Sequence, residues 1–343
     1  MSRCIELAKN GLGTTYPNPL VGSVVVVNDS IIGEGWHYRA GLPHAEVNAI
    51  NSVVNKDLLQ RSTIYVSLEP CSHFGKTPPC ADLIIASGIK KVVIGSLDPN
   101  PKVAGRGVKK LMEAGCDVVV GILADECDQL NKRFFTFHLK KRPYIILKWA
   151  QTLNGFIAPG KSTRGNEKKP VWITNEYARQ FVHKLRAQEQ AILVGTTTVL
   201  DDDPGLTTRN WYGKSPVRVV IDKDLKILKS ASVFNLDAST ILISENNANY
   251  GEHIKLVTAD FSEELAPQIC DILYKNGIQS VIVEGGSKTL QSFIDSNLWD
   301  EASVYTGNAT FEDGVAAPKL SEEKYIEEKI KDNTLQSFIN SAH

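Results

Sequence analysis

A histidine and two cysteines constrain this chain more than any other feature. His44, Cys71 and Cys80 offer one imidazole and two thiols, which are ligands that Zn²⁺ prefers. Three protein ligands leave one tetrahedral position for water, as in catalytic rather than structural zinc sites. Glu46 follows two residues after the histidine, where its carboxylate can carry protons without binding the metal. The fold must therefore bring residues 44–46 next to residues 71–80.

The order of these residues is typical of zinc deaminases that act on nucleobases. Their signature is H-x-E followed by P-C-x-x-C, and the chain has matching residues at 44–46 and 70–71. It departs in one respect, because eight residues, not two, separate the cysteines. A structural zinc site with His73 as the fourth ligand is the alternative, but it leaves Glu46 without a purpose. We therefore expect a catalytic zinc, which lowers the pKa of its water towards ~7.

Length and composition predict a globular protein of two domains. A chain of 343 residues exceeds one average domain, and 42% apolar with 22% charged residues is ordinary for folded proteins. The net charge is −1 and basic runs do not exceed pairs such as Lys140-Lys141, which disfavours a nucleic-acid partner. We found neither a signal-peptide pattern nor the ~20-residue apolar run of a membrane span. We therefore expect a cytoplasmic protein that does not bind membranes.

The cysteine count supports the same location. Six cysteines in a long chain without an export signal indicate reduced thiols in the cytoplasm. Two of them are the expected zinc ligands. We expect the others to be packing residues, namely Cys4, Cys116, Cys127 and Cys270.

The first half of the chain alternates between the two kinds of secondary structure. Expected helices cover residues 3–10, 43–54, 80–87, 107–114 and 125–140, and expected strands cover 21–27, 31–32, 63–68, 91–96 and 116–122. His44 and Cys80 then lie at helix starts, where the positive potential favours a thiolate. We place the domain boundary near Arg142-Pro143, giving domains 1–142 and 143–343.

The second half alternates again, which predicts a mostly parallel sheet that binds ligands at the carboxyl ends of its strands. Expected strands are 144–149, 191–194, 217–221, 240–244, 255–258 and 280–283, and expected helices are 175–188, 263–276 and 287–296. Residues 195–198 and 201–205 are expected turns, and the acidic run at 201–203 is expected to be part of a turn rather than a second metal site. The glycine turn at 285–286, followed by a helix start, suits a phosphate group.

Taken together, the motifs resemble the bifunctional deaminase-reductase family of riboflavin biosynthesis. The matching segments are 13–22, 35–37, 44–46, 69–71, 77–80 and 98–101 in the first half, and 185–188, 202–207 and 283–286 in the second. The long spacer between the cysteines is characteristic of that family. The resemblance extends to about Leu320. It implies an α/β protein with an N-terminal cytidine-deaminase-like three-layer α/β/α domain and a C-terminal dihydrofolate-reductase-like domain.

The resemblance implies two consecutive reactions on one phosphorylated pyrimidine. Hydrolysis removes the 2-amino group of 2,5-diamino-6-ribosylamino-4(3H)-pyrimidinone 5′-phosphate, and NADPH then reduces the ribosyl group of the product to ribityl. Zn²⁺ and NADPH are the implied cofactors. The implied partners are this small molecule and further copies of the chain in a homo-oligomer, with neither nucleic acid nor membrane.

The resemblance also assigns residues to these reactions. Glu46 is the implied proton carrier of the deaminase, and its implied substrate contacts are Asn18, His37 and Lys76. Implied reductase substrate contacts are Arg186, Asp202, Leu206, Arg209 and Glu284. Implied cofactor contacts are Ala150, Trp172, Thr198, Asp202, Gly286, Ser287 and Lys288. Lys148 and Asp202 are our candidates for proton transfer in the reduction.

Two other interpretations of the sequence remain. The first is a nucleobase or tRNA deaminase whose C-terminal domain only binds a partner, and it predicts no oxidation of NADPH. The second is a zinc-stabilised binding protein, for which replacing Glu46 would leave every property intact. The chain also departs from many relatives at residues 152–155 and has a longer, more basic loop at 160–170.

Overall fold

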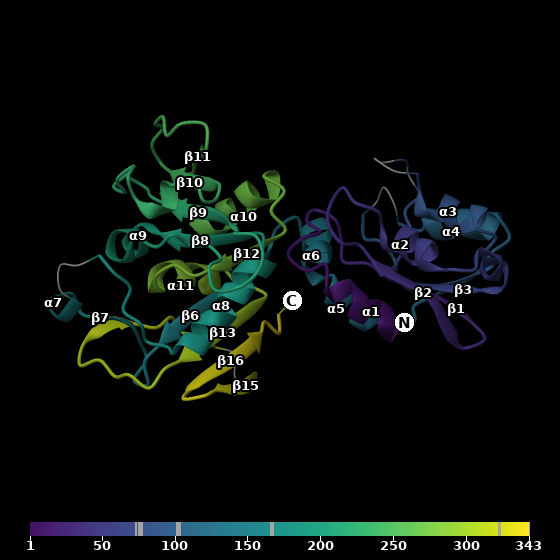
Figure 1. Cartoon of the computed structure of the whole chain (residues 1–343). Coiled ribbons are helices and arrows are strands. Elements are labelled where there is room, and N and C mark those ends of the chain that lie inside the picture. The colour runs from purple at the N-terminus through teal and green to yellow at the C-terminus, as the bar shows by residue number, and fades with distance from the viewer. Residues whose placement is uncertain (73, 75–77, 101–103, 165–167, 322–323, 343) are drawn as a thin grey trace. The chain divides into compact units, whose positions relative to one another are not determined.

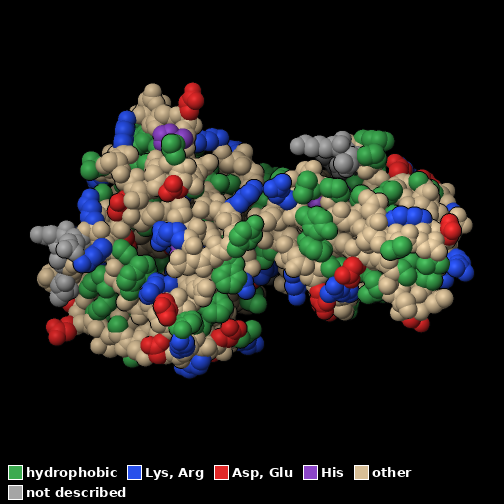
Figure 2. All heavy atoms as spheres, viewed as in Figure 1, with side chains coloured by type: hydrophobic (Ala, Val, Ile, Leu, Met, Phe, Trp, Pro, Cys, Tyr) green, Lys and Arg blue, Asp and Glu red, His purple; other side chains and the backbone are tan. Residues whose placement is uncertain are grey.

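The computed structural model describes the chain except for residues 73, 75–77, 101–103, 165–167, 322–323 and 343 (Figure 1). The chain divides into two compact units, Met1–Lys141 and Arg142–His343, which are described separately below. No helix within the described residues has the length and apolar character needed to cross a membrane. On the face drawn in Figure 2, basic and acidic side chains are interspersed.

The first unit is built on a five-stranded sheet in the order β2-β1-β3-β4-β5. The strands are β1 (Gly22–Val27), β2 (Ser30–Trp36), β3 (Thr63–Leu68), β4 (Lys91–Ser96) and β5 (Asp117–Val120). Strand β1 is antiparallel to both β2 and β3, whereas β3, β4 and β5 are parallel. The helices are α1 (Ser2–Lys9), α2 (Ala45–Ser52), η1 (Lys56–Arg61), α3 (Cys80–Ala86), α4 (Arg106–Glu113), α5 (Ala124–Leu130) and α6 (Lys132–Lys140).

Helices cover both faces of this sheet, as the first unit in Figure 1 shows. Helices α2, α3 and α4 bury Ile50, Ile84 and Leu111 in the same cluster as Val25 of β1. On the opposite face, α1 packs its apolar residues against Val24. Because consecutive strand residues face opposite sides of a sheet, Val24 and Val25 supply one core each. The unit is a three-layer α/β/α fold.

The helix expected over residues 125–140 is divided in two at Asn131. The side chain of Asn131 is buried, with 2% exposed, and it pairs with the backbone of Leu20. Its Oδ1 accepts from Leu20 N at 2.8 Å, and its Nδ2 donates to Leu20 O at 2.8 Å. Asparagine side chains that bond to backbone groups compete with helix continuation. The break between α5 and α6 therefore fixes the segment that ends at Leu20.

The second unit contains a nine-stranded sheet in the order β11-β10-β9-β8-β12-β6-β13-β16-β15. Its strands are β6 (Tyr144–Gln151), β8 (Ala191–Gly195), β9 (Val217–Ile221), β10 (Thr240–Ser244), β11 (Ile254–Thr258), β12 (Ser280–Val283), β13 (Glu301–Thr306), β15 (Tyr325–Ile330) and β16 (Asn333–Ile339). Strands β7 (Phe156–Pro159) and β14 (Gly314–Ala316) form a separate pair. The sheet is parallel from β11 to β13 and antiparallel at β16 and β15.

The helices of this unit lie on both faces of the large sheet. They are α7 (Lys161–Arg164), α8 (Glu176–Gln188), α9 (Thr196–Asp202), η2 (Ser232–Phe234), α10 (Leu265–Lys275) and α11 (Ser287–Asp295). Helices α10 and α11 pack Leu273 and Phe293 against Val281 of β12, while Val199 of α9 joins Ile282 on the other face. Strand β12 is buried along its whole length, as expected of a central parallel strand. The expected α/β fold class is confirmed.

Several segments of the second unit differ from the sequence expectation, which did not include β7, α7, β13 and β14. Residues 196–202, which overlap the turns expected at 195–198 and 201–205, form helix α9. The polar tail after Leu320, about which the sequence indicates little, contains the hairpin β15–β16 beside β13. Five of the six residues of β15 are exposed, because this strand is at the edge of the sheet. An exposed edge strand lacks the apolar alternation on which a strand prediction depends.

Arg142 belongs to the second unit, although we had placed it at the end of the first domain. Its guanidinium makes a bidentate ion pair with Asp300, with bonds of 2.6 and 2.8 Å, and the two side chains are 7% and 6% exposed. Asp300 also accepts from the backbone N–H of Ile145 at 2.8 Å. These bonds attach the start of β6 to the residue that precedes β13.

Replacing Asp300 by asparagine should destabilise the second unit by about 3–5 kcal/mol, because the buried guanidinium of Arg142 loses its counter-charge. Urea unfolding followed by tryptophan fluorescence measures this unit, since four of the five tryptophans belong to it. The matched control is Asp271→Asn, which removes an exposed ion pair with Lys275 and should cost under about 0.5 kcal/mol. Equal losses in the two variants would contradict the prediction.

Candidate active sites

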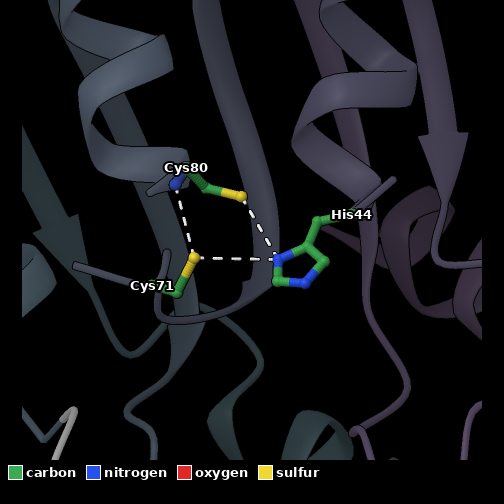
Figure 3. Close-up of side chains that lie close together, drawn as sticks. All are labelled: His44, Cys71 and Cys80. Atoms are coloured by element: carbon green, nitrogen blue, oxygen red, sulfur yellow. Dashed lines mark hydrogen bonds between the residues drawn. The ribbon is translucent and has the colours of Figure 1, made fainter. Parts of the chain in front are cut away.

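The three expected zinc ligands converge at one point of the first unit (Figure 3). His44 is the N-cap residue of α2, Cys71 follows β3, and Cys80 is the first residue of α3. The Nδ1 atom of His44 lies 3.7 Å from Cys71 Sγ and 3.4 Å from Cys80 Sγ. The three ligand atoms lie within 4.8 Å of one another, and no other metal-binding group of this kind was found among the described residues.

The start of helix α3 holds Cys71 in place. The N–H of Cys80 points at Cys71 Sγ over 3.3 Å, and the N–H of Ala81 donates to Cys71 O over 3.1 Å. The hydrogen bond between the two thiols lowers the pKa of Cys71 and raises that of Cys80, and His44 lowers the pKa of Cys71 further. A thiolate is the form that binds a metal. One imidazole and two sulfur atoms facing one centre therefore fit a zinc ion.

Glu46 lies in the first turn of α2, close to the ligands. Its side chain is 3% exposed and hydrogen-bonds to the Cys80 side chain. Burial raises the pKa of Glu46 to about 7, whereas an exposed glutamate has a pKa near 4.3. A carboxyl group with this pKa can take up and release a proton at neutral pH, as a general acid–base group must.

Asn18 and His37 meet beside the zinc ligands. Asn18 Nδ2 lies 3.0 Å from His37 Nε2, and His37 Nδ1 lies 3.1 Å from Pro43 O. The carbonyl can only accept, so Nδ1 carries the proton and Nε2 accepts from Asn18. Burial lowers the pKa of His37, which keeps this ring neutral. Its ring centre is 5.2 Å from that of His44. Lys76, the third expected substrate contact, lies outside the described residues.

A buried ionic cluster marks the second unit. Glu284 follows β12, and its two oxygens bind Arg186 of α8 at 2.9 Å and Lys148 of β6 at 3.4 Å. Burial would raise the pKa of Glu284, but the charges of Arg186 and Lys148 outweigh it and lower this pKa to about 2. Burial lowers the pKa of Lys148 despite the neighbouring carboxylate. The cluster therefore presents an ionised glutamate and a lysine that can release its proton.

Two further residues of this cluster were not expected from the sequence. The ring of Tyr305 on β13 lies 5.9 Å from Lys148 Nζ, and burial raises the pKa of this tyrosine to about 12. His183 of α8 is buried, and its Nδ1 accepts from Arg209 N at 3.2 Å. Tyr305 and His183 lie in elements that also have buried apolar positions, so the sequence pattern indicated no functional role for either residue. Lys148 did give a signal, as a charge within the apolar run of β6.

The glycine turn after β12 forms a narrow cradle. A Cβ atom on Gly285 would lie 2.8 Å from the backbone N of Gly195, so a side chain there would not fit. Gly286 N donates to Thr198 Oγ1 at 3.0 Å, and α11 begins at the next residue, with Ser287 and Lys288 in its first turn. Backbone N–H groups at such a helix start favour phosphate. The N–H groups at the start of α11, with Lys288 in the same turn, are donors of the kind that a phosphate group needs.

The remaining expected contacts differ in their surroundings. Asp202 lies one helical turn after Thr198 on α9 and pairs with Arg164; burial raises its pKa. The side chain of Leu206 is 2% exposed and packs in the core. Trp172 is 61% exposed and contacts the guanidinium of Arg179. The structure therefore brings Thr198 and Gly286 together, and Arg186 and Glu284, but it shows no contact that joins Trp172 to either pair.

The folds and sites define a protein with a zinc-binding deaminase-type unit and a nucleotide-binding α/β unit. Residues 1–96 match the family model for the cytidine and deoxycytidylate deaminase zinc-binding region, and residues 143–341 match the RibD C-terminal domain. The chain is 42% identical to the riboflavin biosynthesis protein RibD of Aquifex aeolicus over 96% of its own length and 92% of that protein. It is 38% identical to RibD of Escherichia coli K12, over 89% and 86% of the two chains.

Solved structures agree with these matches. A deaminase/reductase from Thermotoga maritima, whose title gives both activities, superposes with a TM-score of 0.87 at 42% identity, covering 98% of this chain and 96% of that one. RibD of Acinetobacter baumannii gives a TM-score of 0.86 at 31% identity, covering 98% and 97%. The chain belongs to the RibD family of riboflavin biosynthesis, which joins a deaminase domain to a reductase domain.

The buried ring of His183 should make the stability of the second unit depend on pH. Burial and the charges of Arg186 and Arg209 lower its pKa to about 4, against ~6.5 in an unfolded chain. The folded state thus favours the neutral ring, whose contribution is complete above pH 6.5 and is lost as the pH falls towards 4. The loss amounts to at most about 3 kcal/mol.

Urea unfolding at several pH values checks this prediction. His183→Asn is the matched variant, because the asparagine oxygen can accept from Arg209 N as Nδ1 does but does not titrate. Wild type should lose more stability than the variant between pH 6.5 and 4. Parallel curves for the two proteins would show that His183 does not have a lowered pKa.

Proposed function

We propose that the first unit removes the 2-amino group of 2,5-diamino-6-ribosylamino-4(3H)-pyrimidinone 5′-phosphate and that the second unit reduces the ribosyl group of the product to ribityl with NADPH. The observation that carries the proposal is the convergence of His44, Cys71 and Cys80 beside a buried carboxyl group. The buried Lys148 and Glu284 pair supports a catalytic second unit rather than one that only binds a partner.

In the deaminase unit, His44, Cys71 and Cys80 would hold a zinc ion, which would supply the Lewis acidity that activates water near neutral pH. Glu46 would accept a proton from the attacking water, pass it to the ring nitrogen, and then assist proton transfer to the leaving amine. A carbon–oxygen bond forms, the carbon–nitrogen bond breaks, and ammonia leaves. Asn18 Nδ2 and the neutral ring of His37 orient the base.

In the reductase unit, the turn and helix start at residues 285–288 would hold the pyrophosphate of NADPH, which would supply the hydride. The reduction places the hydride on the anomeric carbon and a proton on the ring oxygen as the bond between these two atoms breaks. Lys148 Nζ is the proton donor that we propose, because burial already favours loss of its proton. Glu284 holds this lysine and Arg186 in position, and Arg186 with Arg209 suits a ribosyl phosphate.

The proposal also includes the cellular location and the oligomeric state of the protein. The chain acts in the cytoplasm, where thiols such as Cys71 and Cys80 stay reduced and able to bind zinc. It forms a homo-oligomer, and the exposed apolar side chains of Val119, Val120 and Ile122 at the edge strand β5 support this, because exposed apolar patches favour association.

Glu46→Gln should lower deamination by about 10²–10⁴-fold, because the amide cannot carry a proton. The purified variant and wild type are incubated with the diaminopyrimidinone phosphate, and the products are identified by mass. Zinc content and reduction of the deaminated intermediate should stay at the wild-type level, which serves as the internal control. A variant that deaminates normally would refute the role of Glu46, and wild type without zinc would refute the deaminase assignment.

Lys148→Met should lower the oxidation of NADPH by about 10²–10⁴-fold with the deaminated intermediate as substrate, because the proton donor is lost. Absorbance at the NADPH band measures the rate. The matched control is Lys184→Met on α8, where the lysine lies over the ring of Trp211; its rate should not change. Wild type that oxidises no NADPH with this substrate would instead support a second unit that only binds a partner.

A further inference from the structure

One buried carboxylate connects the loop of Cys71 to helix α4. Glu69 directly follows Leu68, the last residue of β3, and it is 4% exposed. Its Oε1 accepts from the N–H groups of Gly107 at 2.8 Å and Val108 at 3.2 Å, and its Oε2 accepts from Gly105 at 2.9 Å and Asp98 at 3.3 Å. Three of these donors belong to the start of α4, which has no capping side chain of its own. Glu69 supplies that cap.

The first turn of α4 lies directly against the backbone of Pro70, the residue before Cys71. A Cβ atom at Gly107 would lie only 2.0 Å from Pro70 O. A side chain at position 107 would therefore displace Pro70, and with it the ligand that follows. Cys71 is held from the other side by the start of α3, through the N–H groups of Cys80 and Ala81. The ligand is thus fixed between two helix starts.

We propose that Glu69 is a positioning residue of the zinc centre: it sets the place of Cys71 by anchoring the preceding backbone to α4. Hydrogen bonds from N–H groups to a carboxylate are charge-assisted and about twice as strong as neutral ones. Partners that orient metal ligands change metal affinity by about 10–100-fold when they are removed. The inference rests on the zinc site of the proposed function.

The test replaces Glu69 by glutamine in the full chain. Glutamine keeps the shape, but its NH₂ group faces N–H donors and leaves two of the four bonds unmade. Zinc affinity, measured by competition with a chromogenic chelator, should fall about 10–100-fold. The absorption spectrum of the Co²⁺-substituted protein should change as well, because Cys71 shifts. Reduction by the second unit should remain at the wild-type rate, which shows that the change does not disturb that unit, and far-UV circular dichroism checks that the first unit is folded.

Two further variants separate this role from a general effect on α4. Glu113→Gln removes another carboxylate contact of this helix, the exposed ion pair between Glu113 and Lys109, and should leave zinc affinity unchanged. Gly107→Ala keeps Glu69, but its added Cβ lies 2.0 Å from Pro70 O and 3.1 Å from Glu69 Oε1, so it should weaken zinc binding like Glu69→Gln. A loss of zinc affinity in Glu113→Gln equal to that in Glu69→Gln would overturn the proposal.

Normal zinc affinity and a normal Co²⁺ spectrum in Glu69→Gln would also overturn it. If that variant does not fold, Gly107→Ala decides, and wild-type zinc affinity in Gly107→Ala overturns the proposal. A failure of the proposed function looks different, because wild type itself would then lack zinc or would not deaminate the pyrimidine. Wild type that binds zinc and deaminates, beside an unaffected Glu69→Gln, would refute only the role of Glu69.

Discussion

The deaminase-type unit depends on backbone N–H groups at helix starts that bond to acidic side chains. The start of α3 donates to Cys71, and the start of α4 donates to the carboxylate of Glu69. A helix start has unpaired N–H groups and a positive potential. At both helix starts these N–H groups therefore gain hydrogen-bond partners and stabilise an anion. The parallel strands β3 and β4 bring these helix starts to the same edge of the sheet. The sheet topology thus decides where a thiolate can be held.

The second unit stabilises buried charge by another means. Glu284 binds Lys148 and Arg186, which are 14% and 12% exposed, so side-chain cations replace backbone donors. Such a group tolerates loss of one member poorly, because the others become uncompensated charges. Because Glu284 lies between two cations, its pKa is lowered although the residue is buried. Burial still lowers the pKa of Lys148. The central strands β12 and β6 make this possible, since they are paired in register, β12 is buried along its whole length, and the first four residues of β6 are buried.

The zinc site could be predicted from the sequence because its residues form local motifs. Features that depend on contacts between distant parts of the chain could not. His44, Glu46 and the cysteines stood out because each is a ligand or acid at a fixed offset, and the four other cysteines are buried as expected. The break at Asn131 was missed, because its cause is a bond to Leu20, more than a hundred residues away in the chain. Tyr305 and the hairpin β15–β16 were missed because a buried tyrosine and an exposed edge strand give no distinctive pattern.

The role that we assign to Glu69 shows the same limit at close range. The residue precedes Pro70-Cys71 in a motif that was visible from the start, yet sequence alone gave it no task. Its function arises from α4, which begins more than thirty residues later at Arg106. A carboxylate beside a metal ligand invites a role in proton transfer, but four N–H donors already occupy this one. Glu46 instead hydrogen-bonds to the side chain of Cys80, and burial raises its pKa. Two glutamates near one metal site therefore have different roles: Glu69 holds the backbone in place, and Glu46 can exchange protons.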